Sequence, residues 1–216
     1  ISDKKFLIND KNYLNGEKME KKKILILANS VIGLYKFRKE LLEELIKEGY
    51  SVVISCPNDN QVFKDNILNM GIEFIDTEID RRGMNPVKDM GLFLNYLRLL
   101  KRVKPYKVLT YTIKPNLYGS LACRILKVPY INTVTGIGTL FQSESFIKKV
   151  VVYLYTLAFK KSHCVFFQNE VNKDIFDRLG IIKGLDTYVV PGSGVNLKEF
   201  YPMEKTIVKE YPVFLF

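Results

Sequence analysis

The sequence predicts an α/β fold: a doubly wound, mostly parallel sheet of about seven strands with helices on both faces. Short, continuous apolar runs of strand length alternate along the chain with longer segments whose apolar residues recur at helical spacing. Glycine or proline stands at many of the boundaries between them. This alternation is typical of a parallel sheet whose strands are joined by covering helices.

Seven runs are predicted as strands. The first, ILILA at residues 24–28, contains no polar residue, which indicates a strand buried on both faces. The second, SVVISC at residues 51–56, has a similar character and is closed by Pro57. In chain order, the predicted strands are residues 24–28, 51–56, 72–79, 107–112, 130–134, 164–167 and 187–190.

Six segments between these runs show the spacing of a helix. In the first, Phe37, Leu41 and Leu45 fall on one helical face, and Gly49 provides a stop. A loop over residues 29–35 is predicted to precede this helix. The other predicted helices are residues 61–70, 87–104, 116–127, 146–161 and 170–179.

The chain is predicted to contain one complete domain and the start of another. Residues 1–22 are polar and are expected to be a disordered or added extension, and residues 23–190 form the domain. Residues 191–205 are interpreted as an interdomain hinge, followed at 206–216 by the start of a second, truncated domain. The chain is therefore expected to be about half of a larger molecule.

The composition excludes some classes of site. The three cysteines are far apart and are expected to be reduced, mostly buried thiols of a cytoplasmic protein. The single histidine, His163, precedes the sixth predicted strand and is assigned a structural role, so a zinc site is not expected. No apolar stretch reaches the roughly 20 residues that a membrane span requires.

The formal charge of +10 is compatible with nucleic acid, an anionic membrane surface or a phosphorylated substrate. The basic residues are spread along the chain and aromatic RNA-binding signatures are missing, so nucleic acid is the least favoured. The segment FIKKVVVYLYTLAFKK at residues 146–161 is too short to span a bilayer. A core helix is favoured over one in the membrane interface, although its lysine-rich ends can still contact anionic lipid.

Ligands of such sheets bind at the carboxyl ends of the strands, so the loops there are the candidate site. After the first strand, the dinucleotide-binding pattern GxGxxG is missing, and only Gly33 is present. Free amides at the start of the first helix would still attract an anion, and Arg38, placed in the first turn, would hold a phosphate. The alternative is a turn glycine and a solvated arginine.

Two further loops carry cations. Arg81 and Arg82 follow the third strand in DRRGMNP, where they suit a diphosphate, although an ordinary exposed loop is equally well supported. Lys114 lies at the mouth of the fourth strand and is a candidate partner of a diphosphate. The neighbouring Pro115 is explained by the start of a helix alone.

The loop TGIGT at residues 135–139 is the most unusual segment. Gly136 and Gly138 flank Ile137 at the end of the fifth strand, and they would let the backbone approach a ligand closely. The amides here would line a diphosphate or a sugar. A tight turn without function is the less favoured alternative.

Six segments together resemble a known family. They are KILILANSVIGLYKFRKELLEEL, DRRGMNPVKD, YTIKPNLYGSLACRIL, INTVTGIGTLF, FFQNEVNKDIF and VVPGSGVNLKEFYP. In this order they are similar to the Rossmann-like N-terminal half of GT-B-fold glycosyltransferases of family 4. The resemblance is to bacterial enzymes that extend lipid-diphosphate-linked sugars for capsule, O-antigen or protein glycans.

The resemblance implies a retaining transferase without metal or other cofactor. It would move a hexose or N-acetylhexosamine from a UDP-sugar to a polyprenyl-diphosphate-linked saccharide at the inner face of the cytoplasmic membrane. The implied partners are the sugar nucleotide, this acceptor, the membrane surface and a C-terminal donor domain, but no nucleic acid. The donor-binding glutamates would lie beyond Phe216, so the chain alone is expected to be inactive. Many members also carry a histidine in the loop that reads TGIG here.

No catalytic residue and no metal ligand is assigned. The residues expected to bind substrate are Gly33, Leu34, Arg38, Arg81, Arg82, Lys114, Asn116, Gly136, Ile137, Gly138, Asn169, Glu170, Gly192 and Gly194. Two alternatives stay open: a non-catalytic Rossmann-like binding module, and a nucleotide-dependent oxidoreductase or a nucleotide-sugar-modifying enzyme such as an epimerase.

Overall fold

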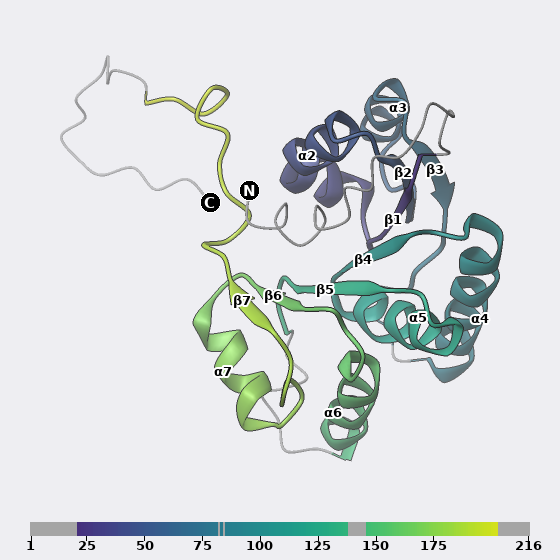
Figure 1. Ribbon diagram of the computed structural model, residues 1–216, viewed down its shortest axis with the longest axis vertical. Coiled ribbons are helices and arrows are strands. Elements are labelled where there is room, and N and C mark those ends of the chain that lie inside the picture. Colours follow the sequence, from purple (N-terminus) through teal and green to yellow (C-terminus); the bar gives the residue numbers. More distant parts are fainter. Residues whose placement is uncertain (1–20, 82, 84, 138–145, 203–216) are drawn as a thin grey trace, which may run out of the picture.

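A single parallel sheet forms the centre of the molecule (Figure 1). The computed structural model describes residues 21–81, 83, 85–137 and 146–202. The strands lie in the order β3-β2-β1-β4-β5-β6-β7, and all neighbours are parallel, which confirms the predicted doubly wound sheet. The strands are β1 (Lys23–Leu27), β2 (Ser51–Cys56), β3 (Glu73–Asp76), β4 (Lys107–Tyr111), β5 (Tyr130–Val134), β6 (Val165–Phe167) and β7 (Thr187–Val189).

Helices connect successive strands, as the alternation in the sequence predicts. They are α2 (Val31–Lys47), α3 (Gln61–Asn69), α4 (Pro86–Val103), the π-helical turn η1 (Pro115–Gly119), α5 (Ser120–Leu126), α6 (Phe146–Phe159) and α7 (Glu170–Arg178). The apolar side chains of β1 pack on both faces of the sheet. Ile24 and Ile26 pack with residues of α2 and α3, whereas Leu25 and Leu27 pack with residues of α4 and α5.

A third apolar cluster covers β6 beside α6 and α7. Tyr155 and Phe159 of α6 pack against Phe176 of α7, and Phe176 also makes an edge-on contact with Phe167 of β6. The middle of α6 therefore belongs to the core, as predicted. The three cysteines are also buried and free, as expected.

The first helix starts earlier than the sequence predicts. The expected loop over residues 29–35 is wrong, because α2 begins at Val31. The side chain of Ser30 caps the helix by accepting a hydrogen bond from the Gly33 amide at 3.1 Å. Gly33 therefore lies inside the first turn, and Arg38 lies about two turns into the helix instead of in its first turn.

Two other boundaries differ from expectation by three residues. The third strand covers only Glu73–Asp76 instead of residues 72–79. The helix after β4 is helical from Ile113 and passes through η1 before α5, so it starts before the predicted residue 116. Gly119 ends the π-helical turn against the sheet, where a Cβ atom would lie only 2.6 Å from Leu27 Cδ1. Close packing on β1 thus shapes this helix, which a local pattern cannot reveal.

Candidate functional site

The carboxyl ends of β1, β3, β4 and β5 surround a cavity of about 240 Å³. This is the edge of a doubly wound sheet at which ligands bind. The lining consists of Asn29, Ile79, Arg81, Thr112, Ile113, Lys114, Thr135 and Gly136. Three residues expected to bind substrate, namely Arg81, Lys114 and Gly136, are thus brought together from separate loops.

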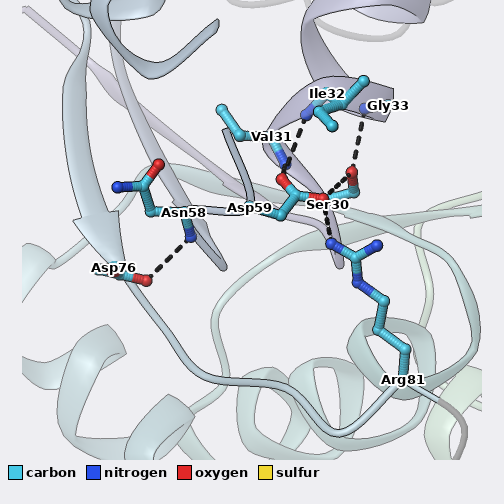
Figure 2. Close-up of polar contacts among 8 residues, drawn as sticks. All are labelled: Ser30, Val31, Ile32, Gly33, Asn58, Asp59, Asp76 and Arg81. Carbon is cyan, nitrogen blue, oxygen red and sulfur yellow. Dashed lines mark hydrogen bonds and ion pairs between the residues drawn. The ribbon is translucent and has the colours of Figure 1, made fainter. Parts of the chain in front are cut away.

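The amides at the start of α2 are occupied by the chain's own side chains (Figure 2). Asp59, in the loop after β2, accepts hydrogen bonds from the amides of Val31 at 2.8 Å and Ile32 at 3.4 Å. The hydroxyl of Ser30 also donates to Asp59, at 2.7 Å. The prediction of free amides that attract an external anion is therefore wrong, because a carboxylate of the protein already holds this position.

Arg81 connects Asp59 to the cavity. Its guanidinium pairs with the Asp59 carboxylate, and the Arg81 side chain keeps 40% of its surface exposed. Burial opposes the ionisation of Asp59, but hydrogen bonds from Ser30, Arg81 and the Val31 amide outweigh it and hold the pKa of Asp59 below its usual value. Asp59 is therefore a carboxylate at neutral pH.

Lys114 is held by a second carboxylate. Its Nζ lies 2.6 Å from Asp89 Oδ1 in α4, and the hydroxyl of Tyr118 donates to Asp89 Oδ2 at 3.0 Å. The side chains of Lys114 and Asp89 are only 11% and 14% exposed, so this pair is more shielded than the pair of Arg81. Burial, followed by the charge of Asp89, raises the pKa of Tyr118, so its hydroxyl remains a donor.

Each cation of the cavity lining thus has its own counter-ion, and neither Asp59 nor Asp89 belongs to the lining. The four formal charges cancel. A guanidinium and an ammonium that approach from different loops can contact a group with more than one negative charge, such as a diphosphate.

Arg38 lies at the same edge of the sheet but outside the cavity lining. Its guanidinium carbon is 4.9 Å from the centre of the Tyr111 ring, and Nη1 donates to the Phe37 carbonyl at 2.7 Å. Gln168, in the amide orientation that gives both ends a partner, accepts from Arg38 Nη2 at 2.9 Å and donates to the Thr135 carbonyl at 3.3 Å. These contacts link α2 to the ends of β4, β5 and β6.

Two expected site residues face the core. Leu34 is a buried residue of α2, and Asn116 of η1 is buried against β4 and β5. Asn116 Oδ1 accepts from the Thr110 hydroxyl at 2.6 Å, and its Nδ2 donates to the Thr133 carbonyl at 2.9 Å. Either side chain would reach a substrate only if the core opened, and the contact predicted for each remains a prediction.

The loop after β5 is described only in part. Gly136 lines the cavity, and Ile137 packs against the apolar cluster of α6 and α7. Gly138 lies outside the described residues, as does Arg82 in the loop after β3. Their predicted contacts with substrate therefore stay predictions.

The segments after β6 and β7 lie beyond the cavity lining. Asn169 caps α7 by accepting from the Asn172 amide at 2.8 Å, and Glu170 is exposed at the start of that helix. Gly192 and Gly194 both have positive φ, at 66° and 79°, which explains the glycines by backbone geometry. Their roles toward substrate also stay predictions.

Thr112 is a cavity residue that no motif singled out. It has a φ of 72°, a left-handed conformation that is rare for a β-branched residue. Its hydroxyl oxygen is buried and has no partner among the described residues. Backbone strain of this kind tends to occur at functional sites. In the sequence, Thr112 is the last residue of the predicted fourth strand and part of the segment YTIKPNLYGSLACRIL, but neither feature indicates its strained backbone.

In the described part of the chain, His, Cys, Asp and Glu do not gather in groups of three or more that could hold a metal ion. Within the same residues, no helix combines the length and the apolar character needed to cross a membrane.

Residues 23–169 match the family described as glycosyl transferase 4-like. The chain belongs to this family. The matched segment extends from the start of β1 to the residue before α7, so it includes every residue of the cavity lining. The cavity is therefore a feature of the glycosyl transferase 4-like segment itself.

A relative of this glycosyl transferase 4-like chain is known from Campylobacter jejuni. It is an N,N'-diacetylbacillosaminyl-diphospho-undecaprenol alpha-1,3-N-acetylgalactosaminyltransferase, 27% identical over 186 residues. The match covers 84% of this chain and 49% of the relative. The chain thus spans about half the length of the curated relative that it matches.

Solved structures share the fold. A glycosyltransferase from Rickettsia africae matches with a TM-score of 0.64 and 17% identity, over 87% of this chain and 47% of that one. A UDP-GlcNAc 2-epimerase from Neisseria meningitidis bound to UDP-GlcNAc matches with a TM-score of 0.56 and 15% identity, over 79% of this chain and 47% of that one. A transferase and an epimerase thus have the same fold, which alone does not separate these activities.

Proposed function

We propose that this chain is the acceptor-binding half of a retaining glycosyltransferase that acts on a polyprenyl-diphosphate-linked saccharide. The transferred group is a hexose or an N-acetylhexosamine from a UDP-sugar, and the product serves the assembly of a surface polysaccharide or glycan. A glycosidic bond forms at the anomeric carbon, the bond from this carbon to the diphosphate breaks, and UDP and a proton are released. The reaction retains the anomeric configuration and uses no metal.

The main support is the pair of cations at the cavity. Arg81 and Lys114 lie at the ligand-binding edge of the sheet in a glycosyl transferase 4-like chain. A diphosphate is the anionic part of the acceptor named for the Campylobacter relative. An ammonium and a guanidinium suit such a group, the first as a point charge and the second as a two-pronged donor.

One further residue of the cavity lining, Gly136, suits the binding of an acceptor. Gly136 lines the cavity, and a Cβ atom at this position would meet nothing within 4 Å, so there is open space beside its backbone. A second domain that closes over this edge would bring the sugar nucleotide to the acceptor and exclude water. The family match favours the transferase over an epimerase or a non-catalytic binding module, although all three are compatible with the fold.

The first prediction concerns Lys114 and is tested by sugar transfer with the full-length enzyme that contains this chain. Lys114→Met should lower kcat/KM for a lipid-diphosphate acceptor about tenfold or more, since a charge-assisted contact contributes roughly 1.5–3 kcal/mol. The matched control is Lys183→Met, at an exposed position away from the cavity lining. Equal transfer by both variants and the wild type would refute the proposed site.

We further propose that the outer face of α4 holds the protein on the inner face of the cytoplasmic membrane. Val87, Met90 and Leu94 lie at helical spacing in its first half and are 81%, 56% and 42% exposed. The exposed positions of its second half include Arg98 and two further cations, Lys101 and Arg102. Within α4, all of which the structure describes, the exposed positions carry no carboxylate. An apolar face followed by cations suits an anionic lipid surface.

The second prediction is that α4 mediates binding to vesicles. Wild-type protein should cosediment with vesicles that contain phosphatidylglycerol and much less with vesicles of phosphatidylcholine alone. Replacing Val87, Met90 and Leu94 by serine should reduce vesicle binding severalfold, because the apolar area that would enter the lipid is lost. The matched control replaces Val62 and Leu68 of α3 by serine. These two residues are similarly exposed, and α3 lies on the face of the sheet opposite to α4. Equal losses in both variants would rule out a specific role of α4.

A further inference from the structure

Asp59 is placed between two groups that can each bind an anion. On one side are the amides of Val31 and Ile32 at the start of α2, and on the other is the guanidinium of Arg81 (Figure 2). The donors come from segments that lie 22 to 28 residues from Asp59 in the sequence. The loops after β2 and β3 and the start of α2 are thus joined through one carboxylate.

Arg81 takes part in both this cluster and the cavity. It pairs with Asp59, and it is also one of the two cations in the cavity lining. The recorded contact uses one guanidinium nitrogen, Nη2, of a side chain that is 40% exposed. A guanidinium has five donor hydrogens in a planar fork, so Arg81 retains donors for a second partner.

We propose that Asp59 is an internal counter-ion that sets the affinity of the cavity for an anionic group. A phosphate or diphosphate that enters between Arg81 and Lys114 competes with the Asp59 carboxylate for the positive charge of Arg81. Asp59 is then a specificity-determining residue, because it weakens the retention of small free anions that have no further contacts. Larger ligands with an apolar or sugar part compensate through the rest of the cavity. The inference rests on the proposed function, in which this anionic group is the diphosphate of the acceptor.

Replacing Asp59 by asparagine removes the charge and the acceptor at Oδ2, which faces Ser30 and Arg81, but it can keep an acceptor at Oδ1. Asparagine is about as good a helix cap as aspartate, so its side-chain oxygen can keep the bonds from Val31 and Ile32. The negative charge beside Arg81 is removed, and with it the repulsion of an incoming anion. The Arg81 side chain also becomes less ordered, which acts in the opposite direction and reduces the net gain.

The experiment measures binding of inorganic pyrophosphate to the 216-residue chain by calorimetry at low ionic strength. Asp59→Asn should bind pyrophosphate about five- to tenfold more tightly than the wild type, as expected for the removal of one nearby charge. Adding Arg81→Ala to Asp59→Asn should abolish this gain. Thermal unfolding of Asp59→Asn checks that the fold is intact.

Asp76→Asn is the matched control. Asp76 lies in the same region, and its carboxylate accepts from the Asn58 amide at 3.1 Å without a recorded contact to Arg81 (Figure 2). This variant changes the net charge by the same amount. It should bind pyrophosphate nearly as the wild type does, so a general effect of net charge is distinguished from the effect of the pair.

Three outcomes would overturn the proposal. They are weaker binding by Asp59→Asn, equal gains in Asp59→Asn and Asp76→Asn, and no detectable binding by either the wild type or Asp59→Asn. The sugar-transfer assay with Lys114→Met tests the proposed function separately. If Lys114→Met lowers sugar transfer as predicted and any of these three outcomes is also observed, the role of Asp59 is refuted and the transferase proposal stands.

Discussion

The charged side chains at the carboxyl edge of the sheet form ion pairs between distant loops. Arg81 pairs with Asp59, and Lys114 pairs with Asp89. The second pair is shielded from solvent, so removing Asp89 alone would leave a poorly solvated ammonium and cost more than the loss of a surface ion pair. Both pairs hold a cation beside the cavity before any ligand arrives.

The third prediction concerns pH and Asp59. Its pKa in the fold is held below the ordinary value of about 4. The ionised carboxylate therefore stabilises the fold above that ordinary value, and this contribution is lost as the pH falls through the lower, folded-state pKa. The difference in thermal unfolding temperature between wild type and Asp59→Asn should be largest near neutral pH and should shrink in acid. A difference that stays constant from neutral to acidic pH would contradict this linkage.

The pairs also explain what the sequence could not predict. Arg81 and Lys114 were expected at the site because cations after a parallel strand lie at the ligand-binding edge. Their partners are 22 and 25 residues away, and no local pattern connects them. α2 starts earlier than predicted for a related reason: the apolar face used for the prediction begins at Phe37, while the cap Ser30 is polar.

At the scale of single elements, the helix between β4 and β5 is shaped by packing on the central strand. Its π-helical turn ends at Gly119, directly over Leu27 of β1. Pi-helical turns are frequent at functional sites, and this one lies next to Lys114 of the cavity. The sequence predicted a helix here from its spacing and its flanking prolines, but the close approach that requires glycine depends on the folded sheet.

The fourth prediction compares two glycines of neighbouring helices. Gly119→Ala should lower the free energy of unfolding by about 1–3 kcal/mol, because the new methyl group would lie 2.6 Å from a buried leucine side chain. Gly91→Ala, on α4, is the control. A Cβ atom there meets nothing within 4 Å, so alanine should stabilise the helix by roughly 0.5–1 kcal/mol. Urea unfolding of both variants measures these changes, and destabilisation by Gly91→Ala with none by Gly119→Ala would contradict the packing argument.

At the scale of the whole molecule, burial decreases from the centre of the sheet to its two edges. All residues of β4 and β5 are buried, whereas those of β7 are only partly buried and the ends of β3 are exposed. The seven strands, their parallel direction and most helix positions could be predicted from the apolar pattern. The order β3-β2-β1-β4 could not, because pairing of β1 with β4 depends on contacts between residues about 80 positions apart.

The fifth prediction is a gradient of amide hydrogen exchange. Peptides that contain β4 and β5 should exchange most slowly, because their amides are released only by global unfolding. Peptides that contain β3 or β7 should exchange faster through local opening at the sheet edges. Mass spectrometry after deuterium labelling measures both. Equal protection of β7 and β5 would show that the edges are not the weaker part of the sheet.

The position of β1 also matters during synthesis on the ribosome. β1 is made before the other six strands of this sheet, yet in the finished sheet it lies between β2 and β4. β2 can pair with it early, but its other side must wait until Lys107–Tyr111 has left the ribosome. An apolar strand with an open edge is prone to pair with other chains. The nascent chain is thus expected to be most vulnerable to aggregation before β4 emerges, and chaperones that shield short apolar strands would act in that interval.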